Sequence, residues 1–468
     1  MLDNSILSLP LRQLAVRIES RKISPVELTE SFLARSEKYG PRYNAYATLM
    51  RERALRQARE AEREIVSGKY RGPLHGIPYA AKDLLAVRGY PTTWGARPYA
   101  NQQFDYDAAV IEKLDRAGAI LIGKSAMIEL AGGMGYRFAS ASLTGAAKNP
   151  WNAACWTCGS SSGSGAIVAA GLAAFAIGTE TWGSILCPSG FCGRTGLRPT
   201  FGRVSRWGAM ALSYSMDKIG PMGRTADDCA LVMAAIAGHD ARDGSSLPIS
   251  EAAFHDSPPS NPARPLRIGW LTNAWEKPDP DVTAAAEAAI AILKAQGCQV
   301  ADAQLPVGPW EDAGTVVIAV EGASAFQDLI ESGRVSELAD PLGQIAGYVN
   351  LQIAASDYMR ALRVRTILRQ KMEPLFTRFD VIAAPTLPVT ATTLETNLET
   401  DLSFADPLGA IGNLLGLPAV SVPCGFKNKT LPVGMQFLAQ VRNDVLVLDL
   451  ARLYQRHTAW ASAQPPMD

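Results

Sequence analysis

The chain lacks an excess of charge of either sign. Its 45 lysine and arginine residues balance 45 aspartate and glutamate residues, and no long run of one sign occurs. Proteins that bind nucleic acid or anionic membranes normally carry a basic patch or stripe. The sequence therefore predicts neither a nucleic acid nor a membrane as a partner. Near-zero net charge leaves self-association, for example as a homodimer, open.

Long hydrophobic runs are equally scarce. The longest apolar runs, such as residues 166–177, are shorter than the ~20 residues that a membrane-spanning helix needs. The N-terminal sequence MLDNSIL carries Asp3 and no basic residue ahead of its apolar positions, so it does not have the form of a signal peptide. Because 47% of the residues are hydrophobic and 19% are charged, we expect a folded protein in the cytoplasm.

Cysteine is sparse, with seven residues scattered over 468 positions. An odd number at irregular spacing favours reduced thiols over a disulfide framework. Two pairs lie close together in sequence, Cys155 with Cys158 and Cys187 with Cys192. Their spacings differ, and no histidine occurs between positions 76 and 238. Since structural zinc sites need four matched ligands, the sequence predicts no metal and no redox motif here.

From about position 76 onward, short apolar segments alternate with helical segments. Strands are expected at 77–83, 119–123, 173–179, 266–271, 380–385 and 419–423, and helices at 108–117, 163–172, 281–296 and 356–376. This alternation predicts an α/β fold with a central mixed, twisted sheet covered by helices on both faces.

The beginning of the chain has a helical pattern. Ser24 and Pro25 have the form of an N-cap and a first helical residue, and they predict a helix that ends at about Tyr39. Residues 44–67 are charged, rich in alanine and periodic, so they predict another helix.

These patterns suggest how the chain is organised. We expect residues 1–70 to form an N-terminal helical segment packed on a single α/β domain, residues 71–468. Residues 239–265 are rich in Pro, Ser, Asp and Ala, which predicts a linker-like excursion.

One expected strand runs into a turn of small and polar residues. The segment GTETWGSI, residues 178–185, presents Ser184 after that strand. Successive backbone N–H groups in such a turn can converge on one point and bind an oxyanion, as acyl transfer requires. Ser184 is therefore a candidate nucleophile, but serine is a poor nucleophile without a base.

Histidine, the usual base, is rare in this chain. It occurs only at positions 75, 239, 255 and 457, and a surface or structural role fits each of these better than catalysis. A buried lysine is the other common base, because desolvation can lower its pKa of about 10.4 by several units. Lys82 ends an expected apolar strand and is placed for that role.

Three segments occur together in an order and spacing that identify a family. They are GPLHGIPYAAKD at 72–83, GSSSGS at 159–164 and GTETWGSI at 178–185. Together they resemble the amidase signature family of serine hydrolases. Segments at 196–205, 216–221, 380–386 and 416–425 agree with it, and the resemblance covers about positions 25–240 and 375–455. It implies the amidase signature fold, an enzyme and no cofactor.

The resemblance also implies a Ser–cisSer–Lys triad. It assigns Ser184 as the nucleophile and Lys82 as the base. Ser160, which follows a cis peptide bond in the family, is assigned as the bridge between them. In this arrangement neutral Lys82 takes a proton from Ser160, which takes one from Ser184 during attack on the carbonyl.

Supporting groups follow from the same resemblance. The backbone N–H groups of Thr181, Trp182, Gly183 and Ser184 are expected to form the oxyanion hole, in which one donor is typically worth about 3–4 kcal/mol of transition-state stabilisation. Ser161 is expected to support the triad by a hydrogen bond to Lys82.

Several positions depart from the family's pattern. Trp182, Cys158 and Ser162 stand where glycine is usual, Glu180 replaces an aspartate, and Leu186 replaces an arginine. In the family the aspartate and the arginine pair, so Glu180, if it is buried, must find another cation or be protonated. Arg194 is the candidate. The bulk of Trp182 is expected either to reshape the pocket wall and favour aryl or apolar acyl groups, or to point into the core.

The sequence thus predicts an amidohydrolase that cleaves amide C–N bonds through a serine acyl-enzyme. The expected substrate is a small, neutral and fairly apolar anilide, primary amide, ester or aryl carbamate. The corresponding activities are those of an aryl acylamidase or a urethanase. The resemblance is poor at about residues 310–360, and we expect residues 305–375 to form a variable region that lines a substrate funnel. In this region Trp310, Phe326 and Tyr348 are expected either to line an apolar funnel or to pack helices.

Alternatives remain open on the sequence alone. The first is the amide-hydrolysing subunit of a glutamine-dependent amidotransferase, which resembles the same family and needs a partner protein. A zinc- or thiol-based binding protein that uses the four clustered cysteines is the second. The third is a pseudoenzyme, since glycines of the family's pattern are replaced.

Overall fold

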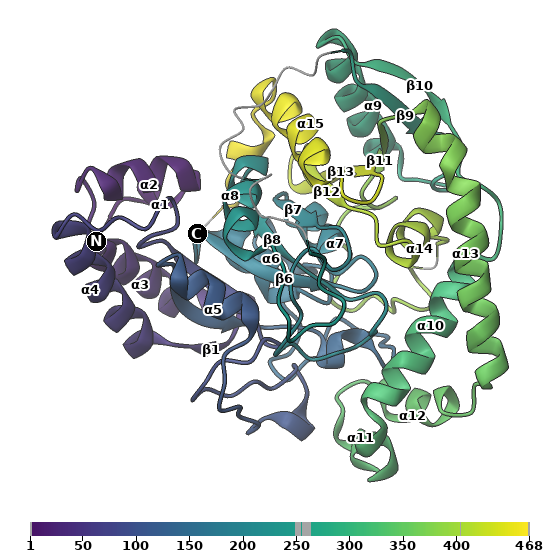
Figure 1. Cartoon of the computed structure of the whole chain (residues 1–468), viewed down its shortest axis with the longest axis horizontal. Helices are drawn as coiled ribbons and strands as arrows, with labels where there is room; N and C mark the ends of the chain where they lie inside the picture. The colour runs from purple at the N-terminus through teal and green to yellow at the C-terminus, as the bar shows by residue number, and fades with distance from the viewer. Residues whose placement is uncertain (1, 249–253, 255–263, 403, 467–468) are drawn as a thin grey trace.

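The computed structural model describes residues 2–248, 254, 264–402 and 404–466. An eleven-stranded sheet crosses the described molecule (Figure 1) in the order β1-β3-β2-β6-β8-β7-β12-β13-β11-β9-β10. Its strands are β1 (Tyr46–Leu49), β2 (Pro78–Lys82), β3 (Ile120–Ser125), β6 (Phe175–Glu180), β7 (Thr195–Arg198), β8 (Lys218–Gly223), β9 (Arg267–Leu271), β10 (Gln299–Ala303), β11 (Val381–Pro385), β12 (Ala419–Lys427) and β13 (Leu431–Ala439). A small separate sheet pairs β4 (Lys148–Asn149) with β5 (Asn152–Trp156).

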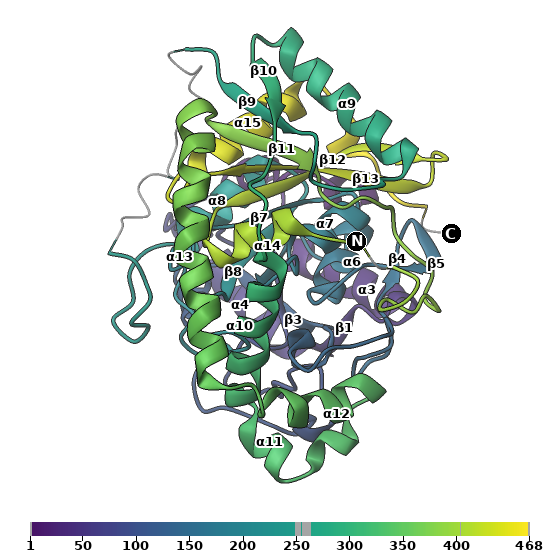
Figure 2. The same ribbon diagram turned by 90° about the vertical axis from the view of Figure 1, so that its right-hand side faces the viewer.

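Helices lie on both sides of the large sheet, as the two perpendicular views show (Figure 2). They are α1 (Asn4–Leu7), α2 (Leu11–Glu19), α3 (Pro25–Tyr43), α4 (Arg51–Val66), α5 (Ala109–Arg116), α6 (Ser162–Ala170), α7 (Leu186–Phe191), α8 (Ala226–Ile236), α9 (Pro280–Ala295), α10 (Trp310–Ala325), α11 (Gln327–Glu331), α12 (Pro341–Asn350), α13 (Ala355–Arg378), α14 (Pro407–Leu414) and α15 (Asp444–Arg456). The predicted α/β fold with a mixed sheet is confirmed. Within the described ranges, no helix combines the length and the apolar character that crossing a membrane requires.

The direction of three neighbouring strands places the functional segments. β2 lies between β3 and β6 and runs parallel to both. The carboxyl ends of β2 and β6 therefore lie at the same edge of the sheet. Lys82 is the last residue of β2 and Glu180 is the last of β6, so the two segments that the sequence singled out meet there.

Helix α6 fixes the serine run close to this edge. Its nine residues are small or aliphatic, and all are buried. A Cβ added to Gly163 would lie 2.4 Å from the carbonyl oxygen of Ala45 and 2.5 Å from the nitrogen of Ala126, so only glycine fits there. The serine–glycine run is thus packed structure and not a flexible connection.

The prediction of a helix at 44–67 is wrong for residues 44–50. Asn44 adopts a left-handed conformation with φ of 47° and ends α3. Residues Tyr46–Leu49 then form β1, which pairs antiparallel with β3, and α4 begins only at Arg51. The pairing is a tertiary contact that local periodicity does not reveal. The division of the chain at residue 70 remains a prediction.

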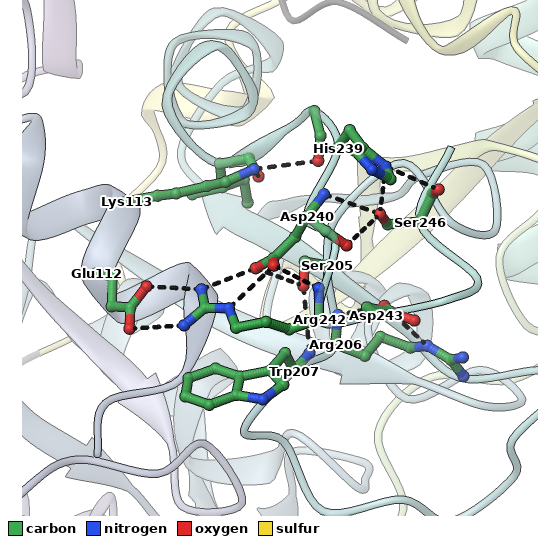
Figure 3. Close-up of polar contacts among 12 residues, drawn as sticks. Glu112, Lys113, Ser205, Arg206, Trp207, His239, Asp240, Arg242, Asp243 and Ser246 are labelled. Atoms are coloured by element: carbon green, nitrogen blue, oxygen red, sulfur yellow. Dashed lines mark hydrogen bonds and ion pairs between the residues drawn. The ribbon is translucent and has the colours of Figure 1, made fainter. Parts of the chain in front are cut away.

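The described part of the expected excursion after α8, residues 239–248, is held to the rest of the protein by ion pairs and a ring contact. Figure 3 shows the guanidinium of Arg242 between two carboxylates, those of Glu112 at 2.7 Å and Asp240 at 2.9 Å. The same guanidinium lies over the ring of Trp207, 3.8 Å from its centroid. The rest of the excursion up to residue 263, apart from Phe254, lies outside the described residues.

Candidate active site

Three buried side chains meet at the carboxyl edge of β2 and β6. Lys82 ends β2, Ser160 lies in the loop before α6, and Ser184 lies in the turn after β6. The Nζ of Lys82 donates a hydrogen bond to Oγ of Ser160 at 2.7 Å. The hydroxyl of Ser160 donates in turn to Oγ of Ser184 at 2.9 Å. The structure therefore brings together, in one chain of hydrogen bonds, the three residues that the sequence assigned to the site.

Backbone contacts hold the serine loop against the turn. The peptide bond between Gly159 and Ser160 is cis, at the position that the resemblance implied. The carbonyl oxygen of Ser160 accepts a hydrogen bond from the nitrogen of Ile128 at 3.2 Å, and the nitrogen of Ser161 donates to the carbonyl oxygen of Ser184 at 3.3 Å. Both serines are thus held through the main chain as well as through their hydroxyls.

The surroundings of Lys82 favour its neutral form. Burial lowers the pKa of Lys82 to about 7, although the carboxylates of Asp217 and Glu180 oppose the shift. At neutral pH a substantial fraction of Lys82 is therefore uncharged and can accept a proton. Its Nζ also donates to Oγ1 of Thr179 at 2.9 Å, which fixes its direction.

The expected contact between Ser161 and Lys82 is absent from the described structure. The hydroxyl of Ser161 donates to the carbonyl oxygen of Thr179 at 3.1 Å and accepts from the nitrogen of Thr179 at 3.2 Å. Ser161 therefore supports Lys82 only indirectly, through the residue that bonds it. The sequence analysis did not identify Thr179 as a partner of Lys82. The available signal was its position just before Glu180 in the GTETWGSI segment.

The turn after β6 keeps several backbone N–H groups free. The carboxylate of Glu180 accepts hydrogen bonds from the nitrogens of Ile185 at 2.9 Å and Leu186 at 3.0 Å, which fixes the far end of the turn. Gly183 adopts a φ of 77°, a conformation that glycine adopts more readily than residues with a Cβ. In the described part of the chain, the amides of residues 182–184 have no hydrogen-bond acceptor. They are available to an oxyanion.

Glu180 pairs with Arg198, and the prediction of Arg194 is wrong. Nη1 of Arg198 lies 2.8 Å from Oε1 of Glu180, and both side chains are buried. Asn413 donates to the same oxygen at 3.2 Å. Arg194 instead donates to backbone carbonyl oxygens, including that of Ala463 at 2.9 Å. Arg198 lies on β7, two strands away from β6, so its approach depends on the order of strands in the sheet.

Replacing Arg198 by methionine is expected to lower the free energy of unfolding by about 3–5 kcal/mol, because it leaves a buried carboxylate without its main cation. Burial alone raises the pKa of Glu180, and Arg198 with Lys218 holds it below its usual value. Urea denaturation of the wild type, Arg198→Met, Glu180→Gln and the double variant measures the coupling. Strictly additive losses would contradict the assigned pair.

Trp182 connects the turn to two helices. Its indole is half-buried, and Nε1 donates to Oδ2 of Asp406 at 2.7 Å. The ring lies against Gly314 of α10 and Gly409 of α14, where an added Cβ would come within 2.9 Å and 2.5 Å of it. These two glycines leave room for the indole. Burial raises the pKa of Asp406 to about 7, against the hydrogen bond from Trp182.

The cysteines are not all free, contrary to the expectation. Cys158 and Cys187 form a disulfide across 29 positions of sequence, a pairing that spacing alone does not reveal. Cys155 and Cys192 are free and buried. Among the described residues, no three His, Cys, Asp or Glu side chains are grouped so that they would hold a metal ion.

A cavity of about 280 Å³ lies beside the turn. Thr179 and Thr181 contribute to its wall, together with the apolar side chains of Met210 and Leu212. Oγ1 of Thr181 donates to Oδ1 of Asp217 at 2.5 Å, so the turn and the cavity wall are joined. This space reaches the residue that contacts Lys82.

Two of the three aromatic residues expected around a funnel pack helices. Trp310 and Phe326 are buried, and the ring of Phe326 lies 6.3 Å from that of Trp94. Tyr348, on α12, is 46% exposed. Of the two roles considered, lining a funnel or packing helices, Trp310 and Phe326 therefore have the second.

Known proteins resemble this chain over almost its whole length. The family model described as Amidase matches residues 27–448. One subunit of the glutamyl-tRNA(Gln) amidotransferase from Picosynechococcus sp. is 35% identical over 485 residues, which cover 98% of this chain and 99% of that relative. The native peptide amidase from Stenotrophomonas maltophilia has a TM-score of 0.86 at 29% identity, with 98% of both chains covered. A bacterial aryl acylamidase has a TM-score of 0.87 at 23% identity, with 99% of this chain and 100% of that chain covered. At this identity the match shows only that the two proteins share a fold.

Fold and site together define a class of protein. A mixed sheet covered by helices carries a buried lysine and two serines at one strand edge, and the class is that of hydrolases acting on C–N bonds. The chain belongs to the amidase signature family.

Proposed function

We propose that this protein hydrolyses amide bonds through an acyl-enzyme formed on Ser184. In the productive state Lys82 is neutral, and Oγ of Ser184 attacks the carbonyl carbon of the substrate. The proton of Ser184 passes to Oγ of Ser160, whose own proton passes to Nζ of Lys82. In this state both hydroxyls are turned from the directions described above, so that Ser184 donates to Ser160 and Ser160 donates to Nζ of Lys82. The separations of 2.9 Å and 2.7 Å allow direct transfer.

The remaining steps use the same groups. The oxyanion of the tetrahedral intermediate binds the free amides of residues 182–184, with the amide of Thr181 as the fourth predicted donor. Removing one such donor typically costs about 3–4 kcal/mol in comparable sites. The relay then runs backwards and protonates the leaving nitrogen, and the C–N bond breaks. Water attacks the acyl ester by the same route, which releases the acid and restores Ser184.

A single observation carries this proposal: a buried lysine with a pKa of about 7 is joined through one serine to another serine beside free amides. Acyl trapping tests it. Brief incubation with 4-nitrophenyl acetate, acid quenching and peptide mass spectrometry should place one acetyl group on Ser184. An acetyl group on another residue, or none, would refute the assignment.

Two substrates deserve comparison. The first is a neutral, apolar amide, anilide or aryl carbamate cleaved by a free-standing enzyme, and the half-buried indole of Trp182 beside the turn supports it. The second is glutamine, cleaved by a subunit that works with a partner protein. Relatives at 35–36% identity that are amidotransferase subunits favour the second more than the first.

A hydrolysis panel separates these substrates. A nitroanilide, a primary amide, a nitrophenyl carbamate and glutamine are each offered to the isolated protein and to the Ser184→Ala variant. Turnover of the anilide or the carbamate by the wild type alone identifies a free-standing amidase. Glutamine turnover that rises when partner proteins are supplied identifies an amidotransferase subunit. No turnover of any substrate that depends on Ser184 would contradict the proposed function.

A further inference from the structure

The two segments that carry Ser160 and Ser184 are also joined by a covalent bond. Cys158 precedes Ser160 by two residues, and Cys187 follows Ser184 by three. The two cysteines form a disulfide across a Cα–Cα distance of 5.9 Å. The hydroxyl contact of 2.9 Å and the backbone contact of Ser161 at 3.3 Å connect the same segments without covalent bonds.

We propose that Cys158 and Cys187 are positioning residues: their disulfide holds the Ser160 loop and the Ser184 turn at the separation that proton transfer needs, so that reducing it slows acylation. This inference rests on the proposed function of Ser184. It adds a redox dependence that the relay itself does not require.

The link acts over a short path at both ends. Only Gly159 separates Cys158 from Ser160. At the other end, the nitrogen of Cys187 donates to the carbonyl oxygen of Gly183 at 2.8 Å, which closes a turn around Ser184. A change at either sulfur is therefore passed to a serine through very few rotatable bonds. Misplacing reacting groups by about 1 Å can cost about 100-fold in rate.

The backbone of Cys158 gives independent support. It adopts a φ of 66°, in the left-handed region. This conformation is unfavourable for a residue with a Cβ, and glycine adopts it freely. A cysteine in this conformation therefore has a conformational cost that glycine would avoid, which is consistent with a role for its sulfur.

The chemistry is reversible and balanced. A dithiol such as dithiothreitol gives two electrons and two protons to the bond between Cys158 and Cys187, which become thiols, while the reagent becomes a cyclic disulfide. The reaction begins when a thiolate attacks one sulfur. Cys158 is 9% exposed and Cys187 is 7% exposed, so both residues are largely buried, and reduction is continued with excess reagent until thiol titration shows that it is complete.

The test measures how fast Ser184 reacts with a fluorophosphonate probe in each redox state. Titration of denatured, unreduced protein should find five thiols, and reduced protein should show all seven. Reduction with dithiothreitol should lower the rate constant of Ser184 labelling about 10- to 100-fold with the probe's inhibition constant unchanged. Reoxidation should restore the rate, which excludes damage to the protein.

Two variants control the result. Cys155→Ser removes a neighbouring free thiol and should remain sensitive to the reductant. Cys158→Gly combined with Cys187→Ala should label slowly in both states, and circular dichroism at the assay temperature checks that it is folded. The wild-type comparison stands without these variants if they do not fold.

Two outcomes would overturn the inference alone: seven thiols in untreated protein, or five thiols together with equal labelling rates before and after reduction. The second would mean that the disulfide is only structural. Failure of Ser184 to label in either state would overturn the proposed function, and this inference with it.

Discussion

Replacing Ser184 by alanine should lower kcat for amide hydrolysis by about 10⁴-fold or more, because residues of a catalytic triad act as a unit. The variant keeps the oxyanion donors of the turn but has no atom that can form the acyl-enzyme. The most active substrate of the panel, measured at saturation in the wild type and in the variant, gives the ratio. Retention of a large part of the activity would show that another residue is the nucleophile.

Ser125 offers a matched control for this experiment. It ends β3, is buried, and its hydroxyl lies 2.7 Å from that of Ser164, much as Ser160 faces Ser184. Ser125→Ala should cost about 1 kcal/mol of stability through one lost hydrogen bond. Its kcat should stay within a few-fold of the wild type. Equal losses in the two variants would mean that general disruption, and not a missing nucleophile, explains the effect of Ser184→Ala.

Local signals were sufficient to place most of the fold. Ser24 caps α3 through the nitrogens of Val26 and Glu27, and Pro25 begins the helix, as the sequence predicts. The apolar segments became strands because buried strands of a covered sheet are continuously hydrophobic. β1 was missed because its residues are stabilised by pairing with β3, far along the chain.

The site shows the same limit more sharply. Motif order located Lys82, Ser160 and Ser184, because each lies in a short segment of characteristic composition. The partner of Glu180 could not be found this way. Arg198 and Asn413 approach it from β7 and α14, 18 and 233 positions away. Such partners depend on the order of strands and on helix packing, which no local pattern encodes.

Lys82 should determine the acidic limb of the pH profile. Burial lowers its pKa to about 7, and only the neutral amine can take the proton of Ser160. As the pH falls below about 7, protonation removes the base, so kcat/KM should fall about tenfold per pH unit and stay constant above it. Lys82→Met should lose about 10²–10⁴-fold in kcat, the range typical of a lost general base, and the limb should disappear.

A second group with a similar pKa could produce the same limb, so the assignment needs a control. Burial raises the pKa of Asp406 to about 7, and this residue contacts Trp182 of the oxyanion turn. Asp406→Asn removes the titration but keeps an oxygen that can accept the indole N–H. If Lys82 is the base, the acidic limb persists in Asp406→Asn. If the limb vanishes there, the titrating group is Asp406, and the pH dependence reports the turn and not the relay.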